Sequence, residues 1–217
     1  MTMSDRKFHW ERVYGERSPE EVGWYQSEPT VSLELIRASG VALDEPIIDV
    51  GGGASVLVDH LLDAGFTDLA VLDLSGNALR RSQERLGPRA PLVTWHEADI
   101  TTFDPDRSYA LWHDRAVFHF LTEAADTRAY VASLRRSLRV GGAVIIAAFG
   151  LDGPTKCSGL DVVRYDETSL CLELGDEFHL AECRSETHVT PGGKAQEFSY
   201  FRYVRMGPEQ SQGAKEA

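Results

Sequence analysis

The sequence predicts an α/β fold built around a mostly parallel sheet that ends in an antiparallel hairpin. Short apolar runs alternate with helical apolar patterns between residues 47 and 149, which is typical of βαβ units. Three consecutive glycines, Gly51 to Gly53, follow the first apolar run. Near the C-terminus, two strand-like segments at 178–189 and 196–205 flank a Pro-Gly-Gly turn signal, which indicates a hairpin.

Apolar periodicity gives the individual elements. Buried strands are predicted at 47–50, 69–73, 92–97, 109–113 and 143–149. Helices are predicted after Pro29 up to Gly40 and at 54–64, 77–86 and 122–138, and Pro19 opens a short one. Gly65 is expected to cap the second of these helices, and Gly141-Gly142 the last. The stretch 150–165 is expected to be a loop.

Composition and charge limit the classes of protein to consider. The chain has 217 residues, 42% hydrophobic and 26% charged, as is ordinary for a globular domain. Its 22 basic and 34 acidic residues give a net charge of −12, which opposes binding to a phosphate backbone. The polar start has no apolar stretch of the signal-peptide kind, and no apolar run is long enough to span a membrane. We therefore expect a cytoplasmic protein that binds neither nucleic acid nor membrane.

The three cysteines, Cys157, Cys171 and Cys183, form no CxxC pair. Since no other ligand cluster is evident, we expect no metal, and the odd number favours free thiols. Cys171 and Cys183 occur in apolar patterns and are expected in the core.

The glycines mark a candidate ligand-binding loop, with a tight turn as the alternative. Glycine lets the backbone adopt positive φ and approach a ligand closely. Asp73 ends the next strand about 20 residues on, where a carboxylate can accept hydrogen bonds from ribose hydroxyls. The final glycine of a GxGxxG dinucleotide motif is missing, and Asp49, two residues before Gly51, disfavours a pyrophosphate. The same carboxylate suits the ammonium group of a methionine moiety.

Asp49, Gly51 and Gly53 match the DxGxG motif of class I, Rossmann-like S-adenosylmethionine (SAM) dependent methyltransferases, and the chain resembles this family over roughly residues 30–206. The resemblance implies a seven-stranded mostly parallel sheet with helices on both faces and a C-terminal antiparallel hairpin. No signal of a second domain is present, so we expect a single domain over 1–206, with a cap segment at 1–40 and a core at 46–206. The polar residues 207–217 are expected to be a disordered tail.

The resemblance assigns cofactor contacts as well. Asp73 corresponds to the family's ribose-binding acid, and Asp99 to the acid that binds the adenine amino group, with Ile100 packing on the ring. For Asp99 alone, a helix N-cap is the alternative. The predicted cofactor residues are Asp49, Gly51, Gly53, Asp73, Leu74, Asp99, Ile100, His113, Tyr25 and Gln26. SAM is the expected cofactor, with S-adenosylhomocysteine (SAH) as its product.

The segment after the fourth strand is expected to border the reactive methyl group. Asp114-Arg115-Ala116 is similar to Asp-Lys/Arg-Gly segments of thiopurine methyltransferase-like enzymes and of lysine methyltransferases that act on citrate synthase and elongation factor 1A. Asp114 and His119 are the predicted catalytic residues, which would orient or deprotonate the acceptor. Alternatively, Asp114 holds an arginine or caps the next helix, and His119 is a hydrogen-bonded helix residue.

Two further segments supply predicted acceptor contacts. The aromatic segment from Trp10 to Gln26 is expected either to cover the sheet edge or to fold over SAM. The loop 150–165 has a length that is often functional, although Cys157 within it can be incidental. The predicted substrate residues are Tyr14, Trp24, Arg115, Cys157, Arg164 and Tyr165.

The predicted function is transfer of a methyl group from SAM to sulfur, nitrogen or oxygen of a small-molecule acceptor by direct displacement. A protein lysine is the alternative acceptor. A non-catalytic SAM-binding or NAD-binding module is the alternative of another class.

Overall fold

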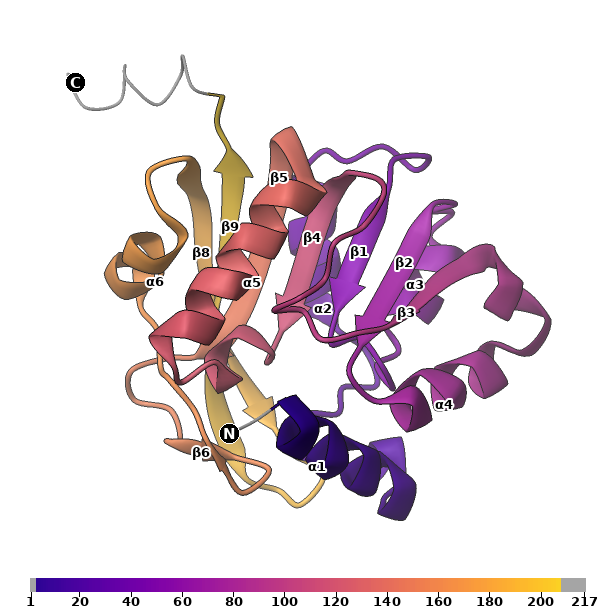
Figure 1. Ribbon diagram of the computed structural model, residues 1–217. Coiled ribbons are helices and arrows are strands. Elements are labelled where there is room, and N and C mark those ends of the chain that lie inside the picture. The colour runs from indigo at the N-terminus through magenta and orange to yellow at the C-terminus, as the bar shows by residue number, and fades with distance from the viewer. Residues whose placement is uncertain (1–2, 208–217) are drawn as a thin grey trace.

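The computed structural model describes residues 3–207, and its centre is one seven-stranded sheet (Figure 1). The strand order is β3-β2-β1-β4-β5-β9-β8. The strands are β1 (Ile47–Val50), β2 (Leu69–Asp73), β3 (Val93–Glu97), β4 (Tyr109–Arg115), β5 (Leu138–Phe149), β8 (Phe178–Val189) and β9 (Ala195–Arg205). Strands β1 to β5 pair in parallel, whereas β9 runs antiparallel to both β5 and β8. The predicted fold class is confirmed.

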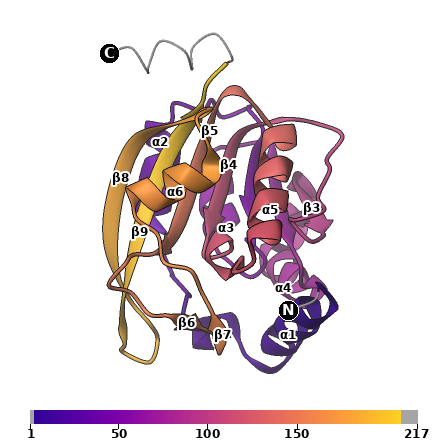
Figure 2. The ribbon, with the colours of Figure 1, turned by 60° about the vertical axis from the view of Figure 1, so that its left-hand side comes forward.

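Helices cover both faces of the sheet (Figures 1 and 2). Helices α5 (Ala124–Ser137) and α6 (Glu167–Leu174) pack on one face through residues such as Tyr130 and Leu170. On the opposite face lie α2 (Thr30–Ala38), α3 (Leu57–Asp63) and α4 (Gly76–Leu86). All four residues of β1 are buried because both faces of this central parallel strand are covered.

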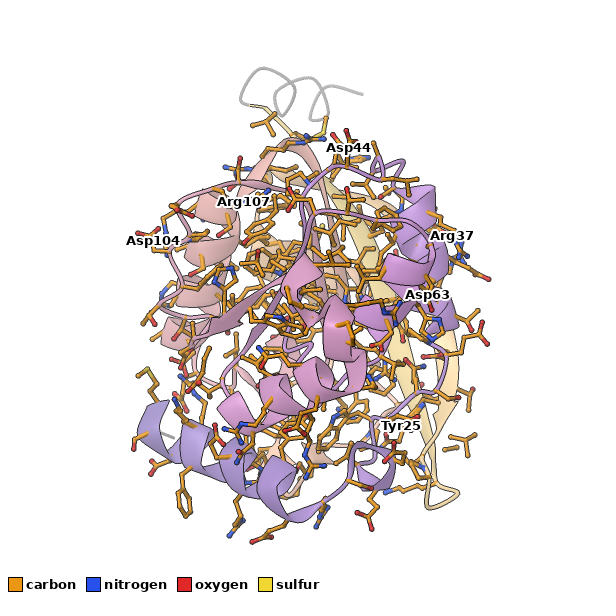
Figure 3. All side chains as sticks on the ribbon, turned by 90° about the vertical axis from the view of Figure 1, so that its right-hand side faces the viewer. Tyr25, Arg37, Asp44, Asp63, Asp104 and Arg107 are labelled. Carbon is orange, nitrogen blue, oxygen red and sulfur yellow. The ribbon has the colours of Figure 1, made fainter. Side chains whose placement is uncertain are left out.

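Helix α1 (Met3–Glu16) lies across the carboxyl ends of the parallel strands, and the short helix η1 (Pro19–Glu21) follows it (Figure 1). The backbone amide of Gly76, at the start of α4, donates a 2.6 Å hydrogen bond to the Glu11 carboxylate of α1. A carboxylate is favourable there because the first amides of a helix are unpaired and the helix dipole is positive. Figure 3 shows Tyr25 at the same end of the molecule as α1, with Asp44 and Arg107 at the opposite end.

Helix α5 ends and β5 begins differently from the prediction. Strand β5 starts at Leu138, directly after α5, so Gly141 and Gly142 lie inside the strand and the expected glycine cap is wrong. The pairing with β4 passes from Leu138 opposite Tyr109 to Ala143 opposite Leu111, and Gly141, at φ 79°, accommodates this bulge.

Several elements were not predicted. They are α1, α6, the small hairpin β6 (Lys156–Cys157) and β7 (Leu160–Asp161), and the short helices η2 (Gly87–Leu92) and η3 (Phe118–Phe120). Asp166 and Ser169 form a capping box at the start of α6, a signal that the sequence contained.

The cysteines are free, but the expected core position is wrong for Cys183, which is exposed on the edge strand β8. Cys171 is half-buried. Of the predicted tail, residues 208–217 lie outside the described part of the chain. Within residues 3–207, no helix is long and apolar enough to cross a membrane, and no group of His, Cys, Asp or Glu could hold a metal ion.

Candidate functional site

A cleft opens at the carboxyl ends of the parallel strands, beneath α1. It has two adjacent hollows, which share the lining residues Tyr14, Trp24, Val50, Gly51 and Arg115. The larger hollow measures about 780 Å³ with the open space at its mouth. Its other lining residues include Arg6, Trp10, Asp73, Leu74, Asp99, Ile100, Val117, Phe120 and Cys157. The smaller hollow is also lined by Tyr25, Gln26, Ser32, Asp49, Gly52 and His113.

Glycine is required at all three positions, because other atoms occupy the space that a side chain would fill. Gly51 has φ 69°, and a Cβ there would overlap the side chain of Val117. A Cβ on Gly52 would overlap the carboxylate of Asp49. A Cβ on Gly53 would meet the carboxylate of Asp73. The loop thus holds two carboxylates against bare backbone beside the cleft.

Asp73 is the buried acid at the end of β2. Its Oδ1 accepts a 2.8 Å hydrogen bond from the backbone amide of Ser75. Burial raises the pKa of Asp73 to about 7, although the backbone amides of Ser75 and Gly53 favour the charged form. Hydrogen bonds from hydroxyl groups, such as those of a ribose, would stabilise the charged form of this buried carboxylate.

Asp99 follows β3 and is engaged on both oxygens. Oδ1 accepts hydrogen bonds from the backbone amide and the hydroxyl of Thr101, at 2.8 and 2.7 Å. Oδ2 lies 3.2 Å from Nη2 of Arg6, whose Nη1 lies 2.5 Å from Asp126 of α5. Arg6 therefore joins α1 to the acid expected to bind adenine.

Asp49 belongs to a buried chain of hydrogen bonds. Its Oδ1 lies 2.7 Å from Nδ1 of His113, and Nε2 of His113 lies 2.9 Å from the hydroxyl of Ser32. The three residues come from β1, β4 and α2, and all three line the smaller hollow.

Aromatic rings form the wall of the larger hollow on the side of α1. The ring centroid of Trp10 lies 5.5 Å from that of Trp24 and 5.1 Å from that of Phe120, in edge-to-face contacts. The indole of Trp24 donates a 3.1 Å hydrogen bond to the hydroxyl of Tyr14. Tyr14 and Trp24 thus lie where the sequence predicted acceptor contacts.

Arg115 joins the N-terminal segment to the C-terminal hairpin. Its Nη1 donates to the carbonyl of Trp24 and its Nε to the hydroxyl of Tyr200, both at 2.8 Å. Its guanidinium also stacks over the ring of Phe198, with 4.4 Å to the centroid. Tyr200 in turn donates a 2.7 Å hydrogen bond to Glu186. These contacts fix Arg115 between the two hollows.

Cys157 also reaches the larger hollow, from the hairpin β6–β7. It is buried, and burial raises the pKa of its thiol to about 12, so that it stays protonated at neutral pH. A nucleophilic Cys-His pair is therefore not favoured.

Asp114 does not line the cleft. Residues alternate along a strand, so Asp114 points to the opposite face from His113 and Arg115. Its carboxylate accepts hydrogen bonds from the backbone amides of Val117 and Phe118 and from the hydroxyl of Tyr130, at 2.7 Å. Burial raises its pKa to about 6. The geometry is that of a turn cap, which was the alternative interpretation.

His119 lies outside the cleft as well. It is fully buried, 4.5 Å from the ring centroid of Phe120 and 5.0 Å from that of Phe149. Neither ring nitrogen has a hydrogen-bond partner among the described residues. Burial lowers its pKa to about 3, with Arg115 contributing. The geometry therefore favours neither a base nor the hydrogen-bonded alternative.

Two predicted substrate residues also lie away from the cleft. Arg164 donates to backbone carbonyls of its own loop, those of Leu151 and Gly153. Tyr165 is buried against the ring of Phe118. The predicted cofactor residues, in contrast, lie at the cleft. All except Gly53 line one of the hollows, and Gly53 lies beside Asp73.

Several cleft residues were not predicted to be in the site. They include Arg6, Ser32, Val117 and Phe120. Phe120 follows β4 closely and could have been found from that position. Arg6 and Ser32 carry no local sequence signal, since they reach the site only through the placement of α1 and α2.

Comparison with known sequences shows which proteins this chain resembles. Residues 47–142 match the sequence family described as "Methyltransferase domain". The match runs from β1 into β5, so it contains Asp49, Asp73 and Asp99. The chain is also similar to the eEF1A lysine and N-terminal methyltransferase of Mus musculus (26% identical over 143 residues, 62% of this chain) and of Homo sapiens (24% over 152 residues, 64%). It spans about a fifth of the length of these relatives, 20% and 21%.

Solved structures share the fold over nearly the whole chain. The N-methyltransferase NodS of Bradyrhizobium japonicum in complex with SAH has a TM-score of 0.71 at 15% identity, covering 94% of this chain and 99% of NodS. A structure concerned with conversion of a disulfide bond into a thioacetal group during echinomycin biosynthesis has a TM-score of 0.73 at 16% identity, covering 95% of both chains. The glycopeptide N-methyltransferase MtfA with SAM has a TM-score of 0.64 at 17% identity, covering 88% and 99%. The predicted resemblance to Rossmann-like, SAM-dependent methyltransferases is confirmed.

Proposed function

We propose that this methyltransferase transfers a methyl group from SAM to a nucleophilic sulfur, nitrogen or oxygen of a small molecule. The observation that carries the proposal is the glycine cradle. Gly52 and Gly53 leave room for the carboxylates of Asp49 and Asp73, and Asp99 lies along the same cleft.

The residues of the cleft fit the cofactor. Asp73 offers a desolvated carboxylate for ribose hydroxyls, and Asp99 and Ile100 offer an acceptor and an apolar surface for adenine. Asp49 offers an anion for an ammonium group, a charge that would oppose the pyrophosphate of NAD. When bound, SAM supplies an electrophilic methyl group on a sulfonium.

The chain's own contribution is positioning and exclusion of water. Helix α1 covers the cleft, and Trp10, Trp24 and Phe120 form an apolar wall beside it. Aromatic faces attract a cationic centre, and a dry site strengthens electrostatic contacts. Holding two reactants in one geometry accounts for a large part of many rate enhancements, so this function does not require a base in the cleft.

A covered, aromatic acceptor site favours a small molecule. We propose Tyr14, Trp24, Arg115 and Cys157 as acceptor contacts, since all four line the larger hollow. Asp114 and His119, predicted from the sequence to be catalytic, are not included because neither lines the cleft. The similarity to eEF1A lysine and N-terminal methyltransferases favours a protein amine as the second candidate acceptor.

Binding and transfer are tested separately. Calorimetry should detect SAM and SAH but not NAD. Methyl-labelled SAM is then incubated with the protein, a metabolite extract and a protein lysate, with the Asp73→Ala variant as control. Label in small molecules supports the proposal, and label confined to protein supports the second candidate. Absence of SAH binding would contradict both.

A further inference from the structure

We propose that Ser32 and His113 are positioning residues, which hold the Asp49 carboxylate in place for the ammonium group of the cofactor's methionine part. This inference rests on the proposed function. It concerns the buried chain Ser32–His113–Asp49, of which only Asp49 has a recognised counterpart in the DxGxG motif.

The sheet register creates the first contact. Asp49 on β1 is the parallel-pair partner of His113 on β4, so their side chains lie on the same face of the sheet. That face is covered by α2, which contributes Ser32. The exposed fraction is 4% for Asp49, 2% for His113 and none for Ser32, so water competes little for these bonds.

The donor and the acceptor of the bond to Asp49 can be assigned from chemistry. An ionised carboxylate only accepts, so Nδ1 of His113 carries a proton and donates to Oδ1 of Asp49. Nε2 on the other side of the ring lies 2.9 Å from the hydroxyl of Ser32, which can either donate or accept. Ser32 thus holds the ring in the orientation that Asp49 needs, in the way that outer partners orient ligating histidines in metal sites.

One carboxylate oxygen remains for a ligand. Oδ2 of Asp49 faces Gly52, where a side chain would overlap it, and Asp49 lines the smaller hollow. With Oδ1 fixed by His113, the carboxylate cannot turn away. A pre-oriented anion loses little entropy when it binds an ammonium group.

Two substitutions of His113 separate its two bonds. In His113→Asn, the amide takes about the place of Nδ1 and can still donate to Asp49. In His113→Gln, the amide takes about the place of Nε2 and reaches Ser32 instead. Ser32→Ala removes only the outer bond. Unfolding temperatures are measured for all three variants, so that loss of the fold is recognised.

The probes are SAH and 5′-methylthioadenosine, which shares the adenosine thioether but lacks the amino-acid part. We expect His113→Gln to weaken SAH binding by about ten- to a hundredfold, the usual effect of a charge-assisted bond. His113→Asn and Ser32→Ala should weaken SAH binding less. All variants should bind 5′-methylthioadenosine with the affinity of the wild type.

Equal losses for both ligands, or wild-type SAH binding by the folded His113→Gln protein, would overturn the inference. If His113→Gln does not fold, the same comparison is decided by Ser32→Ala, where a selective loss for SAH supports the inference and an equal or absent loss overturns it. Failure of the wild type to bind either ligand would instead overturn the proposed function.

Discussion

Arg6 forms an ion pair with Asp99, at 3.2 Å between Nη2 and Oδ2. Since Asp99 is the acid expected to bind an adenine amino group, a residue of α1 already contacts one oxygen of this acid. The pair is well shielded, with side-chain exposures of 13% and 5%, and it therefore holds α1 more strongly than a surface pair would.

Replacing Arg6 by alanine should loosen α1 and free Asp99. We expect faster hydrogen exchange of the α1 amides in the ligand-free protein and severalfold tighter SAH binding by calorimetry. Lys7→Ala is the control, because its pair with Glu97 is about half exposed on both sides and worth little. Weaker SAH binding by Arg6→Ala would show that Arg6 belongs to the bound site.

SAH should protect residues 10–26 from hydrogen exchange in the wild type. Trp10, Tyr14, Trp24, Tyr25 and Gln26 all line the cleft, so a ligand should hold this segment in place. Equal exchange with and without SAH would identify a static cover.

Gly51→Ala should be far more costly than Gly40→Ala. Both glycines have positive φ, 69° and 74°, but a Cβ on Gly40 meets nothing within 4 Å whereas one on Gly51 overlaps Val117. We expect losses of about 1–2 kcal/mol of unfolding free energy for Gly40→Ala and about 2–5 kcal/mol for Gly51→Ala in urea. Adding Val117→Ala should recover part of the second loss. Equal effects of the two glycine substitutions would argue against the clash.

Asp73→Asn should stabilise the protein at pH 8 and weaken SAH binding by about ten- to a hundredfold. Because burial raises the pKa to about 7, the folded protein keeps a proton that the unfolded chain loses near pH 4. The free energy of unfolding therefore falls as the pH rises from about 4 to 7 and then levels off. Thermal unfolding across this range should show a flatter profile for Asp73→Asn. An unchanged profile would contradict the raised pKa.

Asp114→Asn should lower stability more than it lowers turnover. An amide nitrogen would face donors at the turn, so we expect a loss of about 1–3 kcal/mol in urea unfolding. Tyr130→Phe removes one of the same bonds and also the acceptor of the Trp112 indole, so it should likewise lower stability more than turnover. Turnover per folded molecule is measured with the acceptor found in the labelling experiment. A large loss of turnover in a fully stable Asp114→Asn protein would restore the catalytic role.

His119→Phe should stabilise the protein by about 1 kcal/mol at neutral pH, because it removes two buried nitrogens without partners among the described residues. In the wild type, the pKa falls from the ordinary 6.5 to about 3 on folding. The unfolded chain therefore binds more protons between these values, and stability is lost as the pH falls through them. The variant should lose less stability in this range. If His119 acts as a base, His119→Phe should instead abolish turnover.

The sequence was sufficient for the βα core because its signals are local. The apolar run 47–50, the glycines and Asp73 each indicate the local structure without reference to distant residues. The predicted bounds of β1, β2 and β8 are those observed. Helix α1 was missed because its apolar residues do not form a strong stripe, and it is held by polar contacts to distant loops.

The residues at the end of β4 were not placed correctly relative to the cleft, because the two faces of this strand were not distinguished. His113 and Arg115 share the face of Asp49, whereas Asp114 lies on the other face with Tyr130. The predicted strand ended at His113, whereas β4 continues to Arg115, so the alternation of the strand was not extended to Asp114. The burial of His119 depends on Phe149, 30 positions later, and could not be inferred locally.

The glycine loop also limits how this sequence can diverge. The place of a side chain on Gly52 is taken by Asp49 alone, whereas that on Gly53 is taken by both Asp73 and the Cβ of Ala78, so Asp49 and Gly52 form one unit. A larger residue at Gly52 is tolerated only after Asp49 has become smaller, and that first step already removes the anion proposed to bind the ammonium group. Gly52→Ala and Asp49→Ala should therefore show strong epistasis in a double-mutant cycle. Homologues that abandon one member of a pair are expected to have replaced the other as well, and to bind the cofactor by a different arrangement.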